Sequence, residues 1–307
     1  MYYISKKVSD EIYEITDTVD NIKEQFSVSD IIKVVKSGVF VRGVSRTETG
    51  YSIKIYNAEV ELARTRFFNK NIDKDYKIDG TILKKIKSPK EEIEIPYGIT
   101  ILEDKCICGY SDIIKVKIPD SVIKIGRHCF EDCYNLQEVI MQNSVIELLS
   151  CCFFNCGRLK NVIISDSAIK LDWGCFHSCT DLEEITIPDS VTKLGDYCFA
   201  CCNSLKEVTM SNSVIEIGKC CFSDCFNLKE LIIPDSVEEI GVGCFCTRRN
   251  YYKYDDENGI VWSPTSYDIH ITCFSERVKN LILNSCHNFR KNGKSCKFIG
   301  KITVIDR

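Results

Sequence analysis

Residues 187–209 read IPDSVTKLGDYCFACCNSLKEVT, and copies of this 23-residue unit decide the fold. Counting the first residue of a unit as place 1, apolar or small residues occupy places 1, 5, 8, 12, 13, 16, 19 and 22. Place 13 is phenylalanine in every unit except the first, which has Ile107. About half of the chain is therefore a tandem repeat, with units that begin at Ile95, Ile118, Met141, Ile164, Ile187, Met210 and Ile233.

The period and the turn residues predict a solenoid of short strands. Apolar steps of three and four would also suit an amphipathic helix, but proline recurs at place 2 and glycine at place 9 of four units each. Twenty-three residues are also too few for the helix pair of an α-solenoid, which takes about 34. We predict one coil per unit, made of strands and turns, with coils about 4.8 Å apart and like residues stacked in columns. Because Leu149 and Asp172 replace the place-9 glycine, this turn is not expected to need a positive φ.

The 20 cysteines follow the same period. Two columns, at places 12 and 16, run through the units, so their spacing marks a repeat and not a disulfide pattern. We predict reduced, buried thiols that fill the tight turns of each coil. Disulfides between neighbouring coils and binding of a soft metal by stacked thiolates are the alternatives.

The consensus IPxSVxxIGxxCFxxCxxLxxV resembles the BspA-like (Treponema pallidum-type) leucine-rich repeat, whose usual unit has Ala-Phe where this chain has Cys-Phe. Residues 76–102 are similar to the repeat that often opens such arrays, and residues 255–263 are similar to a hairpin inserted between repeats. The resemblance implies a leucine-rich-repeat solenoid and a binding function, mostly towards proteins and often at cell surfaces. It covers Ile95 to about Cys246 clearly.

Three regions follow from where the repeat begins and fails. Residues 1–75 lack the period and predict a small α+β module of unknown role, with strands at 11–17, 39–44 and 51–57 and a capped helix after Asp30 that stops at Gly38. Residues 76–255 form the array. Residues 256–307 are predicted to be a degenerate, basic capping coil, in which residues 278–283 recover the strand pattern of residues 159–164.

Composition limits the possible locations and partners. The net charge is −4, which does not suit a chain that coats nucleic acid as a whole. No apolar run approaches the roughly 18 residues that cross a bilayer, and the N-terminus becomes acidic before a signal peptide could form. We expect a cytoplasmic protein without membrane insertion, and the cell surface is the alternative.

Two clusters near the C-terminus suggest chemistry other than protein binding. Zinc-type ligands occur at His270, Cys273, Cys286, His287 and Cys296, although their spacing is not a recognised finger. Basic residues with interleaved aromatics raise a nucleic-acid contact, through Arg290, Lys291, Lys294 and Lys297 with Phe289 and Phe298. An ordinary polar cap predicts the same composition, so we expect neither metal nor cofactor, and nucleic acid is the weaker alternative partner.

Catalysis finds no support in the sequence. The chain has only four histidines, and it contains no G-x-S-x-G, H-E-x-x-H or G-x-G-x-x-G motif. We therefore predict a non-catalytic protein.

The resemblance implies an outward-facing strip on the concave sheet, formed by the residues on either side of place 22. Place 21 is mainly acidic and place 23 is mainly β-branched, so a rigid strip would alternate carboxylates with apolar groups. Such a strip suits a protein partner with a basic surface or peptide, whereas a plain solvated sheet is the alternative. The candidate partner-binding residues are Glu138, Ile140, Asn161, Ile163, Glu184, Thr186, Glu207, Thr209, Glu230 and Ile232.

The predicted function is a protein–protein interaction scaffold that binds its partner on this sheet. A cell-surface adhesin of BspA type that binds host proteins is the alternative. The identity of the partner and the oligomeric state do not follow from the sequence.

Overall fold

The computed structural model describes two sets of residues. Side chains and backbone are described for residues 72–142, 144–246, 269–288, 298 and 301–305. The backbone alone is described for strands at 3–7, 12–17, 23–27, 39–47, 50–57, 252–255, 259–262, 290–291 and 294–295.

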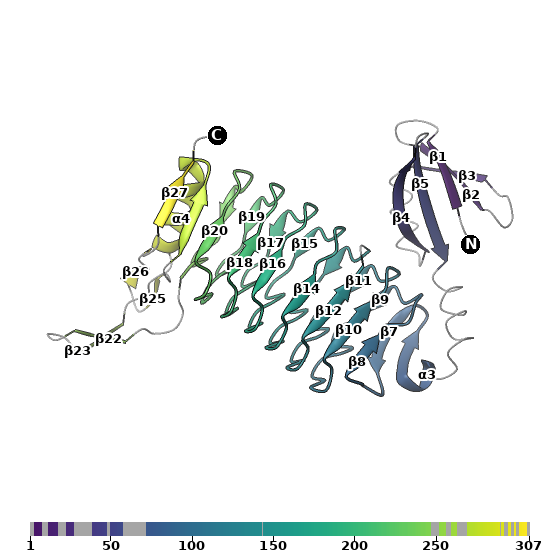
Figure 1. Cartoon of the computed structure of the whole chain (residues 1–307), viewed down its shortest axis with the longest axis horizontal. Coiled ribbons are helices and arrows are strands. Elements are labelled where there is room, and N and C mark those ends of the chain that lie inside the picture. The colour runs from purple at the N-terminus through teal and green to yellow at the C-terminus, as the bar shows by residue number, and fades with distance from the viewer. Residues whose placement is uncertain are drawn as a thin grey trace.

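The array is a right-to-left stack of coils in Figure 1, and each coil contributes one strand to each of two parallel sheets. In the first sheet Val139 pairs with Val116 on one side and with Val162 on the other, so paired residues are one 23-residue unit apart. The predicted circuit of 23 residues is confirmed. The first sheet consists of three consecutive hydrogen-bonded groups: β8 (Glu92–Glu94), β10 (Lys115–Ile118), β12 (Glu138–Met141) and β14 (Asn161–Ile163); β16 (Glu184–Thr186) and β18 (Glu207–Thr209); and β20 (Glu230–Ile232), β24 (His270–Cys273) and β27 (Lys301–Val304).

The second sheet is continuous and opens with an antiparallel hairpin. Most of its strands are two residues long, with the first residue outside and the second buried. The short helix α3 (Ile72–Asp75) precedes it. The strands are, in order, β6 (Tyr76–Asp79), β7 (Ile82–Ile86), β9 (Ile101–Leu102), β11 (Lys124–Ile125), β13 (Glu147–Leu148), β15 (Lys170–Leu171), β17 (Lys193–Leu194), β19 (Glu216–Ile217) and β21 (Glu239–Ile240).

A phenylalanine ladder fills the interior between the sheets and the turns. From Phe130 to Phe245 each place-13 ring lies on the next, with centroids 5.0 to 6.1 Å apart and ring planes within 10° of parallel. Each of these side chains is fully buried. The prediction that successive phenylalanines are immediate neighbours is confirmed.

The cysteine columns line the same interior as free thiols. Each place-16 thiol donates to the carbonyl of place 13 in the preceding coil, as Cys156 Sγ does to Phe130 O at 3.0 Å and Cys179 Sγ to Phe153 O at 3.2 Å. Burial raises the pKa of Cys133 to about 12, so its thiol stays neutral. These contacts explain a small, weakly donating side chain at place 16.

The turn that carries the phenylalanine uses left-handed residues at places 11 and 15. Amide groups at places 11, 13 and 15 donate to the next coil, as His128, Phe130 and Asp132 do to Ser150, Cys152 and Phe154. Ten non-glycine residues hold φ between 50° and 63° there: Lys105, His128, Asp132, Cys151, Asn155, Ser178, Tyr197, Cys201, Cys220 and Asp224. Because L-residues avoid this region, the ladder of inter-coil hydrogen bonds must hold them in place.

Glycine at place 9 is explained by the close approach of neighbouring coils, and not by a left-handed backbone conformation. Its φ is not positive, as the sequence predicted, but a Cβ on Gly218 would lie 2.4 Å from the backbone nitrogen of Asp196 in the preceding coil. Gly126 and Gly241 meet the preceding coil in the same way. Close approach of the coils, and not the dihedral angle, requires glycine here.

The C-terminal end differs from the prediction. Residues 278–283 are not a strand, because they lie in helix α4 (Glu276–His287), which Ser275 caps through its hydroxyl. The apolar steps that suggested a coil bury Val278, Ile282 and Cys286 on one helical face. The strand that continues the first sheet is instead β24, and β27 follows it.

Helix α4 closes the end of the second sheet. Ser285 Oγ donates to Gly241 O at 2.7 Å and accepts from the amide of Cys244, while Arg277 donates to the carbonyls of Asp235 and Val237. These are backbone groups that a further coil would otherwise bind. The first sheet therefore gains two strands beyond β20, whereas the second sheet ends under a helix.

The remaining strands are described by their backbone. β1 (Tyr3–Lys7), β2 (Ile12–Asp17) and β3 (Lys23–Ser27) form an antiparallel sheet, and β4 (Val39–Thr47) pairs with β5 (Gly50–Asn57). The three strands predicted before residue 58 are confirmed, while the helix predicted between Asp30 and Gly38 lies outside the described residues. β22 (Tyr252–Asp255) and β23 (Gly259–Trp262) form the expected hairpin, and β25 (Arg290–Lys291) pairs with β26 (Lys294–Ser295).

Candidate functional site

The first sheet carries the two exposed columns named from the sequence. In β16, β18 and β20 the middle residue is buried and its two neighbours are exposed, because successive strand residues point to opposite faces. Ile163 and Ile232 expose 65% and 57% of their surface, which is unusual for isoleucine. Glu138 and Ile140 are only half-buried, and Asn161, Thr186 and Thr209 are exposed. The sheet thus brings all ten candidate residues to one face, but it does not expose them equally.

Three glutamates stand side by side at the C-terminal half of this face. Glu184 and Glu207 are direct partners in the parallel pair β16–β18, and β20 brings Glu230 next in line. Neighbouring strands lie about 4.8 Å apart, so the carboxylates form a like-charged row. Within the described part of the chain, no ion pair joins any of the three to a cation. We call these three residues the carboxylate row.

The N-terminal half of the same column is compensated. Lys115 and Glu138 are direct partners in β10 and β12 and form an ion pair, and Asn161 next to them is neutral. The hydrogen bond to Glu138 raises the pKa of Lys115, so the pair keeps its charges. The candidate face therefore has an N-terminal end with an ion pair and a C-terminal end, the carboxylate row, without one among the described side chains. We call these the paired end and the unpaired end.

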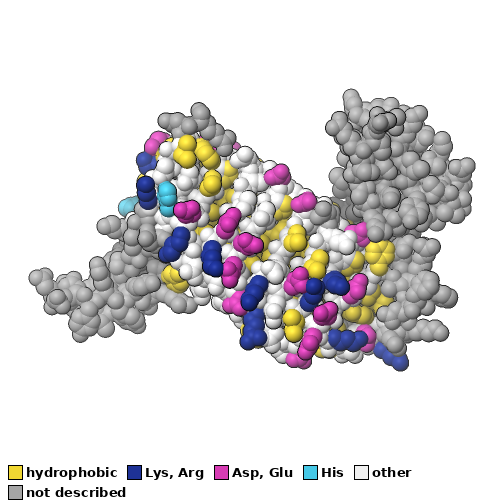
Figure 2. All heavy atoms as spheres, viewed as in Figure 1, with side chains coloured by type: hydrophobic (Ala, Val, Ile, Leu, Met, Phe, Trp, Pro, Cys, Tyr) yellow, Lys and Arg dark blue, Asp and Glu magenta, His cyan; other side chains and the backbone are white. Residues whose placement is uncertain are grey.

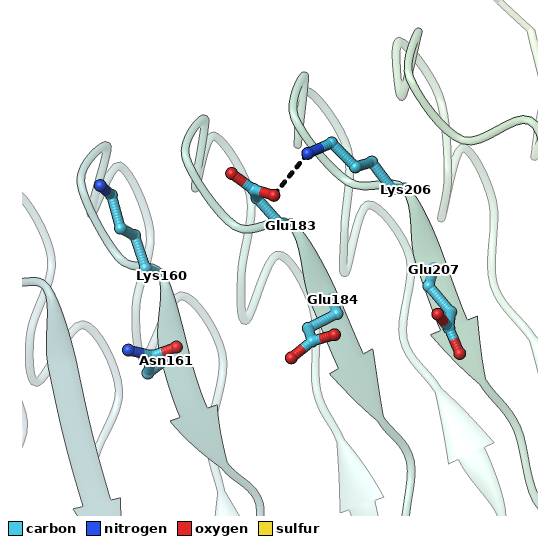
Figure 3. A pocket seen from close by; sticks show the side chains of 6 residues that line it. All are labelled: Lys160, Asn161, Glu183, Glu184, Lys206 and Glu207. Carbon is cyan, nitrogen blue, oxygen red and sulfur yellow. Dashed lines mark hydrogen bonds and ion pairs between the residues drawn. The ribbon is translucent and has the colours of Figure 1, made fainter.

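A groove opens at the start of the unpaired end. It has a volume of about 380 Å³, and Lys160, Glu183 and Lys206 line it together with Asn161, Glu184 and Glu207. Figure 3 shows the two lysines and Glu183 along the edge where the strands begin, and Glu184 and Glu207 over the strands themselves. Lys206 Nζ lies 2.5 Å from Glu183 Oε2, and this contact lowers the pKa of Glu183.

The sequence interpretation missed the residues at place 20 of this groove. Place 20 holds an exposed basic row, formed by Lys160, Lys206 and Lys229 and interrupted by Glu183. Reading one place further back along the same columns would have found it. Figure 2 shows acidic and basic side chains close together across the array, with hydrophobic side chains between them. The face thus carries a basic row, an acidic row and a β-branched row, in that order.

The residues proposed as zinc ligands have other partners or lie apart. His270 Nε2 is 2.8 Å from Thr303 Oγ1 in the neighbouring strand, and Cys273 is buried in β24 with its pKa raised by burial. Cys286 is buried in α4, whose last residue is the exposed His287. Among the described residues no three His, Cys, Asp or Glu side chains gather as a metal site, and Cys296 lies outside them.

The basic C-terminal segment is only partly described. Arg290, Lys291 and Lys294 belong to β25 and β26, whose side chains are outside the described set, as are Phe289 and Lys297. Phe298 packs against the hydrophobic core. Its partial burial gives Phe298 a structural role, while the other aromatic, Phe289, lies outside the described residues. No helix in the described parts of the chain is long and apolar enough to span a bilayer.

Of the solved structures compared, one with a TM-score above 0.5 supports the same fold. A leucine-rich repeat protein of T. pallidum matches with a TM-score of 0.53 and 24% identity, over 57% of this chain and 86% of that one. A leucine rich cell surface protein of Faecalibacterium prausnitzii matches with a TM-score of 0.49 and 24% identity, over 64% of each chain. A leucine-rich repeat protein of Bacteroides ovatus matches with a TM-score of 0.48 and 21% identity, over 73% of this chain and 65% of that one.

Comparison by sequence identifies the repeat itself. A search of curated proteins finds no match. The family described as the BspA type leucine rich repeat region matches in six copies, over residues 77–200 and 170–260. The matched residues include the coils described above, and they make up more than half of the chain. The protein therefore belongs to the BspA type leucine rich repeat family.

Proposed function

We propose that the protein is a non-catalytic scaffold that binds a basic protein partner on its first sheet. Membership of a leucine-rich repeat family is consistent with a protein-interaction or surface-binding role, and such repeats are generally non-enzymatic. The observation that carries the finer proposal is the carboxylate row Glu184, Glu207 and Glu230. None of the three forms an ion pair within the described structure, although Lys206, Lys229 and His270 occupy neighbouring positions. A basic partner would supply the missing charge.

The energetic argument is that the row costs stability without a partner. Like charges directly opposite in a sheet destabilise it by a few tenths to about 1 kcal/mol per pair. The row contains two such neighbour pairs, so a bound cationic surface removes a cost that the free protein carries. A sheet that served only as a solvated wall would gain stability from alternating charges, as β10 and β12 do.

Exposed apolar residues alone would not single out this face. Ile163 and Ile232 are exposed on the first sheet, but Ile169 and Ile215 beside the second sheet also expose 54% and 45% of their surface. Charge is therefore the feature that separates the faces. On the first sheet the apolar column, with Thr186 and Thr209 between the two isoleucines, flanks the carboxylate row and adds area for a partner to bury.

The test compares charge reversal on the two sheets. The first variant is Glu184→Lys/Glu207→Lys/Glu230→Lys, and the matched control is Glu147→Lys/Glu216→Lys/Glu239→Lys on the second sheet, with the same change in net charge. Each protein captures partners from native lysate, after its melting temperature has been measured. We expect the wild type and the control to capture the same partner proteins, and the first variant to lose them. Identical capture by all three proteins would reject the proposal.

The cellular location stays a prediction. A reducing compartment suits the array, since its described cysteines are free thiols packed in the interior.

A further inference from the structure

We propose that the partner segment is an α-helix that lies along the solenoid axis, across the strands of the first sheet. This inference rests on the proposed function and adds the secondary structure and stripe pattern of the partner. Its basis is the repeat distance of the carboxylate row, together with the order of the three rows on this face.

The row repeats at the pitch of a helix. Its three carboxylates follow the strand spacing of about 4.8 Å, whereas an α-helix returns to the same face about every 5.4 Å. From Glu184 to Glu230 the row advances about 9.6 Å and two helical turns advance about 10.8 Å. Long Lys or Arg side chains absorb a mismatch of about 1 Å. A helix can therefore place one cation on each carboxylate.

Extended partners do not match the row. In a β-strand, residues on the same face recur about every 6.7 Å, so two steps advance about 13 Å and overshoot Glu230. A polyproline helix returns to the same face about every 9.3 Å, which serves Glu184 and Glu230 but leaves Glu207 between them without a cation. Only the α-helix satisfies all three carboxylates with a regular spacing.

The flanking rows set the pattern of the partner helix. The basic row of Lys160, Lys206 and Lys229, interrupted by Glu183 beside Glu184, lies on one side of the carboxylate row. The β-branched residues Thr186 and Thr209 lie on the other side. The complementary helix carries a basic stripe between an acidic stripe and an apolar stripe. Because the order of the rows is fixed on the sheet, the order of the stripes also fixes the direction of the bound helix.

Two exposed isoleucines set the length of the contact. Ile163 and Ile232 are three coils apart, or about 14 Å at the strand spacing. A helix covers that distance in about ten residues, or nearly three turns. Apolar side chains at both ends of such a segment would meet the two isoleucines, while threonine methyl groups fill the centre.

The experiment measures binding of synthetic peptides to the full-length protein by fluorescence polarisation. The first peptide is a stapled 18-residue helix with a Lys stripe between a Glu stripe and a Leu stripe. A second stapled helix of the same composition has the Leu stripe in the middle. A third peptide is extended with Lys at every second residue, and a fourth is proline-rich with Lys at every third residue.

We expect the first peptide to bind at least ten-fold more tightly than the other three. Glu184→Lys/Glu207→Lys/Glu230→Lys should weaken that binding at least ten-fold, and the second-sheet control variant should retain it. Comparable or tighter binding of an extended or proline-rich peptide, abolished by the first variant, would overturn the helix and leave the proposed function standing. Binding that the first variant does not weaken, or no binding of any peptide, would overturn both.

Discussion

The two sheets of the solenoid share one interior but differ in how far their outward charged residues form ion pairs. On the second sheet, the outer column from Lys124 to Glu239 holds three Lys and three Glu. Each Lys there has a carboxylate within 4 Å: Lys124 with Glu147 at 2.9 Å, Lys170 with Asp172 at 3.8 Å and Lys193 with Glu216 at 2.6 Å. On the first sheet, the column from Lys115 to Glu230 holds one Lys and four Glu.

This difference shows that two sheets of one solenoid can carry different electrostatic costs on their outer faces. Stacking places like positions about one strand spacing apart, so any charged column must alternate in sign or repel itself. The second sheet does not alternate throughout, because Lys170 faces Lys193 and Glu216 faces Glu239, but every lysine of its column has a carboxylate within 4 Å. In the C-terminal half of the first sheet, none of the three neighbouring glutamates forms such a pair with a described residue. Under the proposed function, the positive charge of a partner would offset the cost of this row.

The largest expected effect is unfolding at high pH, which tests whether the two sheets unfold together as one cooperative unit. Burial raises the pKa of Cys133 to about 12 and of Cys151 to about 11 from a usual 9.0, and it raises that of the other place-12 and place-16 thiols that show a shift. Neutral thiols stay in the folded array while the unfolded chain ionises, so stability is complete below pH 9 and falls as pH rises towards 11. We expect complete unfolding of the array by about pH 10.5 under reducing conditions, because each thiol loses about 1.4 kcal/mol per pH unit.

Circular dichroism and thiol reactivity, followed against pH, should report a single transition. Loss of strand signal in two separate steps would show that the sheets do not share one cooperative interior, and the comparison between them would fail. Cys179→Ala removes one buried thiol and should reduce the pH slope of the unfolding free energy by about 1.4 kcal/mol per pH unit above pH 9. An unchanged slope would contradict the assignment of the slope to these thiols.

An intermediate effect on stability distinguishes a glycine that follows a second-sheet strand from a glycine that precedes a first-sheet strand. Gly218→Ala places a Cβ against the backbone of Asp196, directly after the second-sheet strand β19, and should destabilise the protein by about 3 kcal/mol. Gly157 lies ahead of β14 in the first sheet, and a Cβ there would lie 3.5 Å from Thr180 Oγ1. Gly157→Ala should therefore change stability by at most about 1 kcal/mol. Urea denaturation of both variants measures the difference, and equal costs would refute the close approach of coils at place 9.

The smallest effect addresses the charge comparison directly. Glu207→Lys makes the carboxylate row alternate, so we expect it to stabilise the protein by about 0.5 kcal/mol. Lys124→Glu on the second sheet breaks the pair with Glu147 and leaves only the uncharged Ile101 on its other side, so it should destabilise by a similar amount. Both changes should shrink in 1 M NaCl, because salt screens exposed charges. The same sign for both variants in thermal melts at low salt would show that the sheets are electrostatically alike.

The solenoid was predictable because the same residue type recurs at each buried place of the 23-residue unit. Phenylalanine at place 13 and cysteine at places 12 and 16 had to stack once the circuit was 23 residues long. The left-handed turn residues could not be predicted, since Cys201 and Tyr197 do not favour that conformation and only the inter-coil hydrogen bonds hold it. Helix α4 was missed because apolar steps of three to five suit both a coil and a helix. Ser275 followed by Glu276 was the available signal for its start.

The candidate face was predictable as a surface but not as a site. Alternation about place 22 correctly gave the outward residues Glu184 and Thr186. The ion pair of Lys115 with Glu138 was not evident, because it depends on which residues become partners across the strands. The basic row with Lys160 and Lys206 was not predicted, because alternation about the buried place 22 points only to places 21 and 23. The role of the face in partner binding stays a prediction.

Helix α4 also bears on how large the molecule can become. A bare last coil would offer Gly241 O and the amides of Gly243 and Cys244 to the first coil of another copy, and such joining has no natural end. Ser285 occupies these groups within the same chain. At this end of the second sheet, the backbone groups that could bind another copy are occupied within the same chain. The number of stacked coils is therefore set by the length of the repeat array and does not grow through this edge with protein concentration.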